Sequence, residues 1–133
     1  MTRARRGLVA ATLATGFLLA SMGTAHAGDT GGALRSPVGD WRTTTMGVKQ
    51  TITFDDEGKV YGDSGCNRFT GGYKVKGDRI TIGPLASTMM FCEGKMDAEA
   101  AFLKKLQKVV AYSATDVKLK LFTPKDVMVF KAA

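Results

Sequence analysis

Histidine is almost absent from this chain of 133 residues, which has only His26. That residue lies in an N-terminal segment that we expect to be removed, and the remainder then has none. A chain without histidine lacks the usual general base of enzymes and the usual activator of Ser and Cys nucleophiles. It also lacks the commonest ligand of zinc sites. We therefore expect no catalytic residue, no metal site and no cofactor, and we predict that the protein is not an enzyme.

Acidic residues in a calcium-binding pattern are missing as well. The densest acidic run is Asp55-Asp56-Glu57, which is followed by Gly58. Calcium loops place several oxygen ligands at alternate positions of a longer segment. The run at 55–57 does not have that spacing, so we interpret it as the solvated tip of a hairpin.

Clusters of basic residues are also scarce. The chain has 19 Lys and Arg against 12 Asp and Glu, a formal net charge of +7. The basic residues are scattered singly, apart from Lys104-Lys105. Proteins that bind nucleic acid usually gather Lys and Arg on one face or along one helix. We therefore expect no nucleic-acid partner.

Residues 1–27 have the layout of a secretory signal peptide. Arg3, Arg5 and Arg6 precede an uncharged apolar stretch, and Ala25-His26-Ala27 is a small-x-small cleavage signal. The apolar stretch barely reaches the length of about 18 residues that a membrane span requires, which disfavours a retained anchor. Cleavage after Ala27 would leave 106 of the 133 residues, enough for one domain, and would lower the formal charge from +7 to +4. We expect an exported protein, periplasmic or secreted, without a membrane anchor in the mature chain.

The only cysteines are Cys66 and Cys92. Outside the cytoplasm, a disulfide between them is the expected state. The bond would close a loop of about 27 residues, a constraint worth roughly 3.5 kcal/mol in the chain-entropy treatment. Redox catalysts usually place their cysteines closer together, as C-x-x-C. We expect a structural disulfide, with a redox couple and a pair of free thiols as the alternatives.

Short strands are predicted over most of the chain, because polar and apolar residues alternate with period 2. Residues 28–36 are Gly-rich and are expected to form a flexible lead-in, and the domain is expected over 37–133. Turn sequences at 55–58 and 77–78 favour two hairpins. The segments predicted as strands, in chain order, are 51–54, 59–62, 73–76, 79–82, 117–121 and 127–130, the last of which is apolar throughout.

One segment, 97–110, has helical periodicity instead. Asp97 is placed to cap its N-terminus, and lysines in its second half suit the helix dipole. Glu99 is expected to face solvent together with these lysines. We predict an amphipathic helix of about 12–15 residues, packed on the sheet. The fold class is then α+β: a small single domain, a monomer, with a mainly antiparallel sheet that could curl towards a barrel. The apolar positions on one helical face are Ala98, Phe102, Leu106, Val109 and Val110.

Three smaller features have a structural and a functional interpretation. Met89-Met90-Phe91 is expected to pack in the core beside the disulfide, with an apolar ligand groove as the alternative. Trp41 is expected in the core, with an acceptor for its indole N–H. Asn67 is expected to bond the backbone of its own turn, and Arg68 to pair with a surface acid. The alternative is that Asn67 and Arg68 line a small polar site.

Several motifs follow one another in a characteristic order along the chain. They are Trp41, Gly65-Cys66-Asn67, Gly71, Tyr73, Ile80-Thr81-Ile82, Thr88-Met89-Met90-Phe91-Cys92, Glu99 with Phe102, and the closing segments 117–121 and 129–130. In this order they resemble the META domain family, also called HslJ-like, over roughly residues 38–131. The resemblance implies a small antiparallel domain with one helix, exported or lipid-anchored in bacteria, with no established enzymatic activity. This chain lacks the lipid-attachment cysteine of the lipoprotein members.

The resemblance also implies a role in envelope stress or antibiotic tolerance, because the best-known member is heat-inducible and linked to novobiocin resistance. We predict a non-enzymatic module that binds an unidentified protein or a small apolar ligand of the envelope. The alternative is an extracellular protein-interaction domain of the protease-inhibitor type. The motif residues predicted to take part in binding are Gly65, Asn67, Arg68, Thr88 and Met89.

A free-thiol count and an intact mass, measured on the exported protein, test processing and disulfide formation together. We expect a chain that begins at Gly28 and has no reactive thiol, either native or denatured, because export exposes both cysteines to an oxidising compartment. Two reactive thiols after denaturation would exclude the disulfide. An intact N-terminus on the exported protein would exclude the signal peptide.

Overall fold

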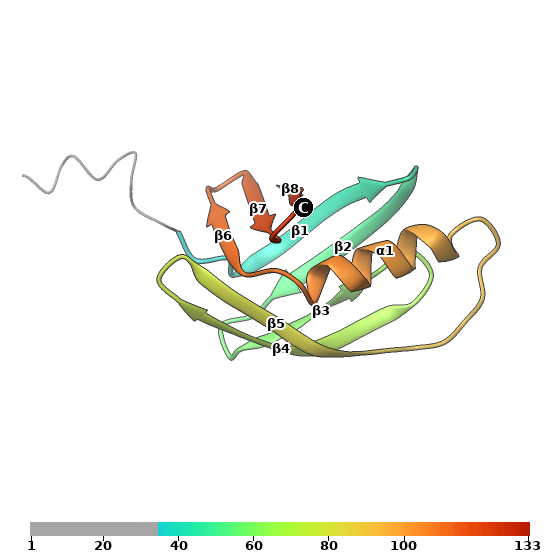
Figure 1. The fold of residues 1–133 in the computed structure, drawn as a ribbon, viewed down its shortest axis with the longest axis horizontal. Coiled ribbons are helices and arrows are strands. Elements are labelled where there is room, and N and C mark those ends of the chain that lie inside the picture. Colours follow the sequence, from blue (N-terminus) through green and yellow to red (C-terminus); the bar gives the residue numbers. More distant parts are fainter. Residues whose placement is uncertain (1–34) are drawn as a thin grey trace, which may run out of the picture. The chain divides into compact units, whose positions relative to one another are not determined.

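The computed structural model describes residues 35–133, which form eight strands and one helix (Figure 1). The predicted signal peptide at 1–27 and most of the lead-in at 28–36 lie outside the described residues. The helix α1, Met96–Leu106, lies between the fifth and sixth strands in the sequence. The strands are β1 (Gly39–Thr45), β2 (Val48–Phe54), β3 (Lys59–Asp63), β4 (Arg68–Lys76), β5 (Arg79–Ser87), β6 (Ala111–Ala114), β7 (Lys118–Phe122) and β8 (Val127–Ala132).

The strands join in chain order into a closed antiparallel barrel. This confirms the antiparallel sheet, and its closure goes further than the predicted curling. Two seams are short. β5 meets β6 at the single pair Arg79 and Ala111, and β1 meets β8 only at Trp41–Ala132 and Arg42–Lys131. Most of β5 therefore has a hydrogen-bonded neighbour on one side only, the β4 side.

Phe102 of α1 inserts into the core of the barrel. Its ring makes edge contacts with Phe69 of β4 and Phe130 of β8, at centroid distances of 5.8 and 6.2 Å. The helix thus links strands on both sides of the β5–β6 seam and completes the core, which confirms a helix packed on the sheet. The residues of the predicted strand segments that lie in this core are Ile52, Phe54, Val60, Ile80, Ile82, Leu119, Leu121, Met128 and Phe130.

Trp41 is buried at the start of the barrel, as predicted. Trp41 is 4% exposed, and its indole N–H donates a hydrogen bond to the carbonyl of Pro37 at 2.8 Å. The buried indole therefore has the acceptor that its desolvated N–H requires.

The helix differs from its prediction in length, cap and exposed face. It spans 11 residues, and Lys95 holds the N-cap position in place of Asp97, without a side-chain hydrogen bond. Val110 is exposed and precedes β6, so the chain leaves the helix before the predicted end. Glu99, expected in solvent, is 4% exposed. Helical periodicity misplaced Glu99 because its polar partners come from a distant segment of the chain.

Alternation failed to predict β1 and β6. β1 reads GDWRTTT, in which only Trp41 is fully buried, and β6 has four residues. Both are set by their neighbours, since β1 pairs with β2 over its whole length and β6 pairs throughout with β7. The two predicted hairpins are present as the antiparallel pairs β2–β3 and β4–β5. Among the described residues, no helix is long and apolar enough to cross a bilayer.

Phe102→Ala should lower the free energy of unfolding by about 3–5 kcal/mol, because removal of the ring leaves a cavity in the core. Urea unfolding followed by circular dichroism measures the change. Leu103→Ala is the matched control, since Leu103 lies on the same helix but is only partly buried; it should cost less than half as much. Equal losses would contradict the central role of Phe102.

Candidate functional site

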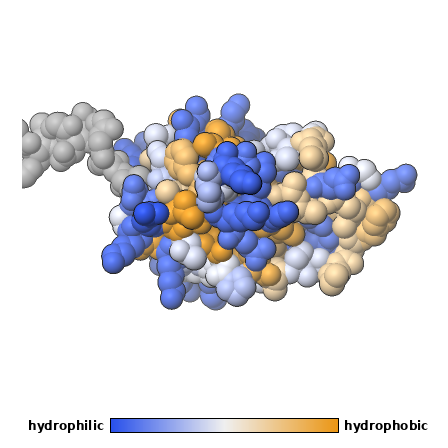
Figure 2. Space-filling view, viewed as in Figure 1, coloured by the Kyte–Doolittle hydropathy of each residue, from blue (hydrophilic) through white to orange (hydrophobic). Residues whose placement is uncertain are grey.

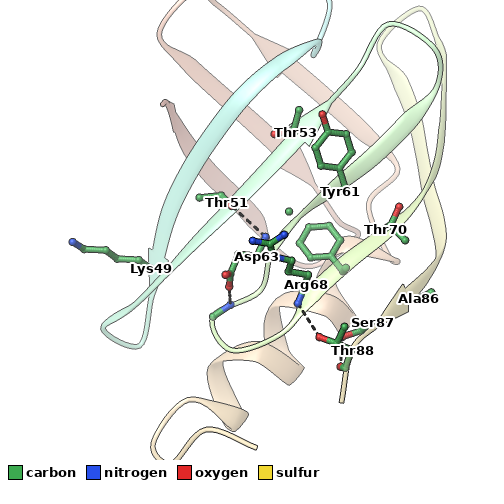
Figure 3. A pocket seen from close by; sticks show the side chains of 13 residues that line it. Lys49, Thr51, Thr53, Tyr61, Asp63, Arg68, Thr70, Ala86, Ser87 and Thr88 are labelled. Carbon is green, nitrogen blue, oxygen red and sulfur yellow. Dashed lines mark hydrogen bonds between the residues drawn. The ribbon is translucent and has the colours of Figure 1, made fainter. Parts of the chain in front are cut away.

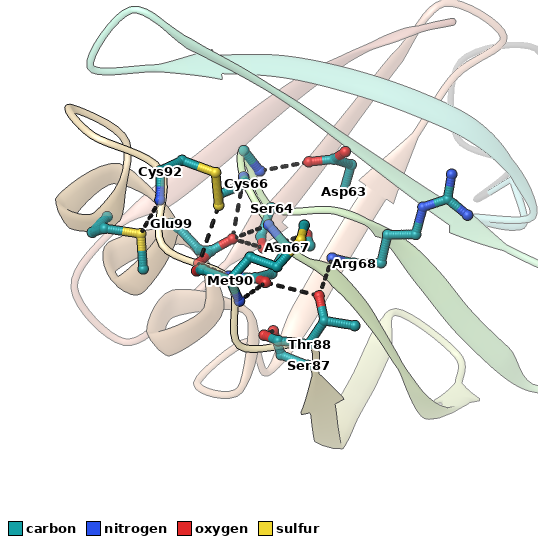
Figure 4. The surroundings of a disulfide bond; sticks show 12 residues. Asp63, Ser64, Cys66, Asn67, Arg68, Ser87, Thr88, Met90, Cys92 and Glu99 are labelled. Carbon is teal, nitrogen blue, oxygen red and sulfur yellow. Dashed lines mark hydrogen bonds between the residues drawn. A yellow bond between two sulfur atoms is a disulfide. The ribbon is translucent and has the colours of Figure 1, made fainter.

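A disulfide ties the corner between β3 and β4 to the loop that precedes α1 (Figure 4). Cys66 and Cys92 are bonded, with their Cα atoms 5.8 Å apart, which confirms the predicted pairing. Cys92 ends the apolar segment after β5, and Cys66 lies two residues before β4. The bond therefore fixes the loop at 88–95 against the corner at 64–67.

The carboxylate of Glu99 organises the interior of this corner (Figure 4). It accepts hydrogen bonds from the Ser64 hydroxyl at 2.6 Å, from the Asn67 backbone N–H at 2.5 Å and from the Asn67 amide at 2.7 Å. The Cys66 N–H is a fourth donor, at 3.2 Å. Burial raises the pKa of Glu99, but the hydrogen bonds from Ser64, Asn67 and Cys66 outweigh it and hold this pKa below its ordinary value. The group is thus a buried, ionised carboxylate.

Asn67 joins Glu99 to the loop before α1. Its amide nitrogen also donates to the Met90 carbonyl at 3.0 Å, and its Oδ1 accepts from the Met90 N–H at 2.6 Å and the Thr88 hydroxyl at 2.8 Å. Asn67 is 2% exposed. The expected bonds within its own turn are therefore replaced by bonds to residues more than 20 positions away. This side chain holds the loop in place from inside the molecule.

A groove crosses the outer face of β2–β5 beside this corner (Figure 3) and encloses about 910 Å³. Its walls are built mainly from residues at the outward positions of the four strands. Gly65 closes one end, where its φ of +123° and the nearby Val48 side chain leave no room for a Cβ atom. The lining residues are Lys49, Thr51, Thr53, Tyr61, Gly62, Asp63, Gly65, Arg68, Phe69, Thr70, Ala86, Ser87 and Thr88.

The groove presents two cations and a row of hydroxyl groups. Lys49 and Arg68 are exposed, and neither forms an ion pair within residues 35–133, so the predicted pairing of Arg68 with an acid is wrong there. Asp63, the carboxylate of the groove, accepts the Gly65 N–H at 2.8 Å. Tyr61 is 44% exposed and offers an aromatic face. This combination suits a ligand with an anionic group and an apolar body.

The geometry supports a metal centre less well than it supports a site for an anionic ligand. The described residues contain no group of three His, Cys, Asp or Glu side chains that could hold a metal ion. Glu99, the buried carboxylate, already accepts four hydrogen bonds. Because Asp63 caps a turn and stands beside Arg68 in the groove, the site favours anions over cations.

The five residues predicted to take part in binding separate into three groups. Gly65, Arg68 and Thr88 line the groove. Asn67 lies behind it, buried in the Glu99 network, and Met89 lies on the loop outside it. The motif did not indicate the groove residues of β2 and β3, namely Lys49, Thr51, Thr53, Tyr61 and Asp63. Their outward positions in the predicted strands were the available signal, and the pairing of β3 with β4 places them on the same outer face as Arg68.

Met89-Met90-Phe91 is not in the core, contrary to the prediction. The three side chains are 95%, 58% and 79% exposed. They do not line the groove over β2–β5 either. The physical reason is that Asn67 anchors the main chain of Met90 and the disulfide anchors Cys92, which turns the apolar side chains outward. Figure 2 shows apolar surface at the end of the molecule where this loop turns.

Comparisons with known proteins identify the domain. The sequence profile of the META domain matches residues 34–133. The fold is similar to the NMR structure of a protein from Burkholderia xenovorans, with a TM-score of 0.60, 22% identity, and coverage of 71% of this chain and 81% of that one. A second NMR structure gives a TM-score of 0.57 and 22% identity, with 70% and 87% covered. Among curated proteins, no sequence matches the chain. At these identities the similarity supports the fold alone.

Glu99→Gln should destabilise the protein in a pH-dependent way. The native pKa lies below that of an unfolded glutamate, about 4.3, so the ionised group contributes its full stability above that pH and loses it as the pH falls through the native value. We expect a loss of about 2–3 kcal/mol at pH 7, because charge-assisted hydrogen bonds are removed, and a smaller difference between variant and wild type below pH ~4. Urea unfolding from pH 7 to pH 3 measures both.

Glu93→Gln is the matched control, because Glu93 is an exposed acid in the neighbouring loop. It should follow the wild-type curve at every pH. A difference between Glu99→Gln and wild type that stays constant from pH 7 to pH 3 would show that the carboxylate is not held ionised by the network.

Proposed function

The chain belongs to the META domain family, and from this premise we propose that it is an exported, non-enzymatic module that acts by binding a ligand in the groove over β2–β5. The observation that carries the proposal is that two cations, Lys49 and Arg68, line this groove without an ion-pair partner in residues 35–133. An exposed guanidinium and an exposed ammonium beside a hydroxyl-lined wall are suited to hold an anionic group.

The hydrogen bonds of the two carboxylates at this site, Glu99 and Asp63, favour binding over catalysis. A general base works best with a pKa near the working pH. The pKa of Glu99 lies below its ordinary value, and its oxygens are occupied inside the corner. Asp63 is engaged by the turn at Gly65. The buried carboxylate of Glu99 is thus not placed to exchange protons with a ligand in the groove, and one oxygen of Asp63 is occupied by the turn.

The rigidity of the corner supports the same function. The disulfide and the Glu99 network order the segment that contains Arg68 before any ligand arrives. A preorganised site loses less conformational entropy on binding. The ligand class that fits the walls is an amphipathic anion, whose acid meets Arg68 and Lys49 and whose apolar body lies on Tyr61. Retention of such a molecule in the envelope would give the domain its role in tolerance to stress or antibiotics.

Novobiocin, an aromatic amphipathic acid, is the first ligand to test. We expect calorimetric titration to detect binding that weakens about tenfold in Arg68→Gln or Lys49→Gln, because each substitution removes one charge-assisted contact. The affinity should also fall with added salt, since the contacts are exposed and screened.

Lys74→Gln is the matched control, because Lys74 is an exposed lysine of β4 that does not line the groove. It should leave the affinity unchanged. If the wild type does not bind this amphipathic anion, or if all three variants weaken equally, the groove is not the site.

A further inference from the structure

The loop between β5 and α1 exposes apolar side chains on a backbone that is held from inside. Met89 and Phe91 are the two most exposed large hydrophobic residues among those described. Exposed apolar clusters of this kind usually mark interaction sites. Ser87 and Thr88 line the groove, but Met89, Met90 and Phe91 do not, so the use of these three side chains is a separate question from the ligand of the groove.

Successive residues of this loop point their main-chain N–H and C=O groups to opposite sides. The Thr88 N–H donates to the Arg68 carbonyl at 3.0 Å, and both main-chain groups of Met90 bond the Asn67 side chain. The N–H of Thr88 and both main-chain groups of Met90 thus point towards the segment at 67–68. In an extended chain the intervening residues turn theirs to the opposite edge.

That opposite edge is open. Within residues 35–133, Met89 and Phe91 form no main-chain hydrogen bond. β6 pairs with β5 only at Arg79, far from this end of the strand. An open strand edge beside exposed side chains is the arrangement by which an extended segment adds to a sheet of a partner protein.

We propose that residues 87–91 form a substrate-like loop that inhibits serine proteinases with an apolar specificity pocket, with Met89 in that pocket. An extended substrate forms main-chain hydrogen bonds with such a proteinase at every second residue. The bonded residues are the one directly before the scissile bond, the one two positions before that residue, and the one two positions after it. With Met89 before the scissile bond, these are Ser87, Met89 and Phe91, whose main-chain groups face the open edge.

The anchoring of the loop accounts for inhibition in place of cleavage. Attack of the proteinase serine on the Met89 carbonyl forms a C–O bond and breaks the peptide C–N bond to Met90, and the serine proton passes through the proteinase histidine to the Met90 nitrogen. Asn67 holds Met90 by both main-chain groups, and the disulfide holds Cys92. The new amine therefore stays beside the acyl group, and the reverse reaction, which re-forms the peptide bond, outpaces hydrolysis.

The chemistry of Met89 defines the class of proteinase. A straight apolar side chain fits pockets of the chymotrypsin and subtilisin type, whereas trypsin requires Lys or Arg opposite its pocket aspartate. Phe91 would add an apolar contact on the far side of the scissile bond. The corner on which the loop rests is fixed, so little ordering accompanies the encounter.

The test measures inhibition of chymotrypsin, subtilisin and trypsin with small chromogenic substrates. We expect the wild-type protein to inhibit chymotrypsin or subtilisin with a constant below about 1 μM, and not to inhibit trypsin. Met89→Lys should gain inhibition of trypsin and lose about 100-fold or more against the other two. Met89 is 95% exposed, so this substitution does not endanger the fold.

Met46→Lys is the matched control, because Met46 is an exposed methionine in the β1–β2 turn, where no disulfide or amide anchors the chain. It should inhibit as the wild type does and gain nothing against trypsin. The proposal fails if the wild type inhibits neither apolar-pocket enzyme and Met89→Lys does not inhibit trypsin. Rapid cleavage between residues 89 and 90 without inhibition would also overturn it, as would Met89-dependent binding to lipid vesicles in the absence of any inhibition.

Discussion

The buried carboxylate of Glu99 is the constraint on which the rest of this corner depends. An ionised group in the interior costs several kcal/mol unless it is paired or fully hydrogen-bonded. Here it is balanced by N–H and O–H donors from a single segment, residues 64–67, without a cation. Because the acceptor lies on α1 and the donors precede β4, the charge fixes the helix against the barrel. Phe102 follows one helical turn later, which places its ring in the core.

The disulfide and the Glu99 network act on the same loop by different means. The covalent bond restricts the denatured chain, so it stabilises without setting an orientation. The hydrogen bonds of Asn67 set the orientation, since they hold both main-chain groups of Met90. Together they keep a loop with three large apolar residues exposed, where hydrophobic burial alone would fold it inward. This arrangement gives both the rigid wall of the groove and the outward-facing tip.

Sequence pattern predicted those parts of the fold in which each residue's own polarity decides its position. The six segments predicted as strands lie in strands apart from Val117, which precedes β7, and the two hairpins pair as expected. Glu99 and Met89 were misplaced for one common reason, which is that distant hydrogen-bonding partners reversed the usual relation between polarity and burial. β1 was not predicted because its strand conformation comes from its pairing with β2 and not from alternation of its own residues. The groove was predicted only in part: the motif contains Arg68 and Thr88, whereas Lys49 and Tyr61 join them through the pairing of β2, β3, β4 and β5 on one outer face.

Thr88 stands where the two proposed binding surfaces meet. Its hydroxyl accepts the Arg68 N–H at 3.1 Å and donates to the Asn67 amide oxygen at 2.8 Å, so it links the groove to the anchor of the loop. Such a link could carry coupling only if it had two alternative arrangements of similar energy. Asn67 is already fully engaged by Glu99, Met90 and Thr88, and any rearrangement would leave buried polar groups unpaired. The corner is therefore better suited to hold two sites rigid than to transmit a change between them.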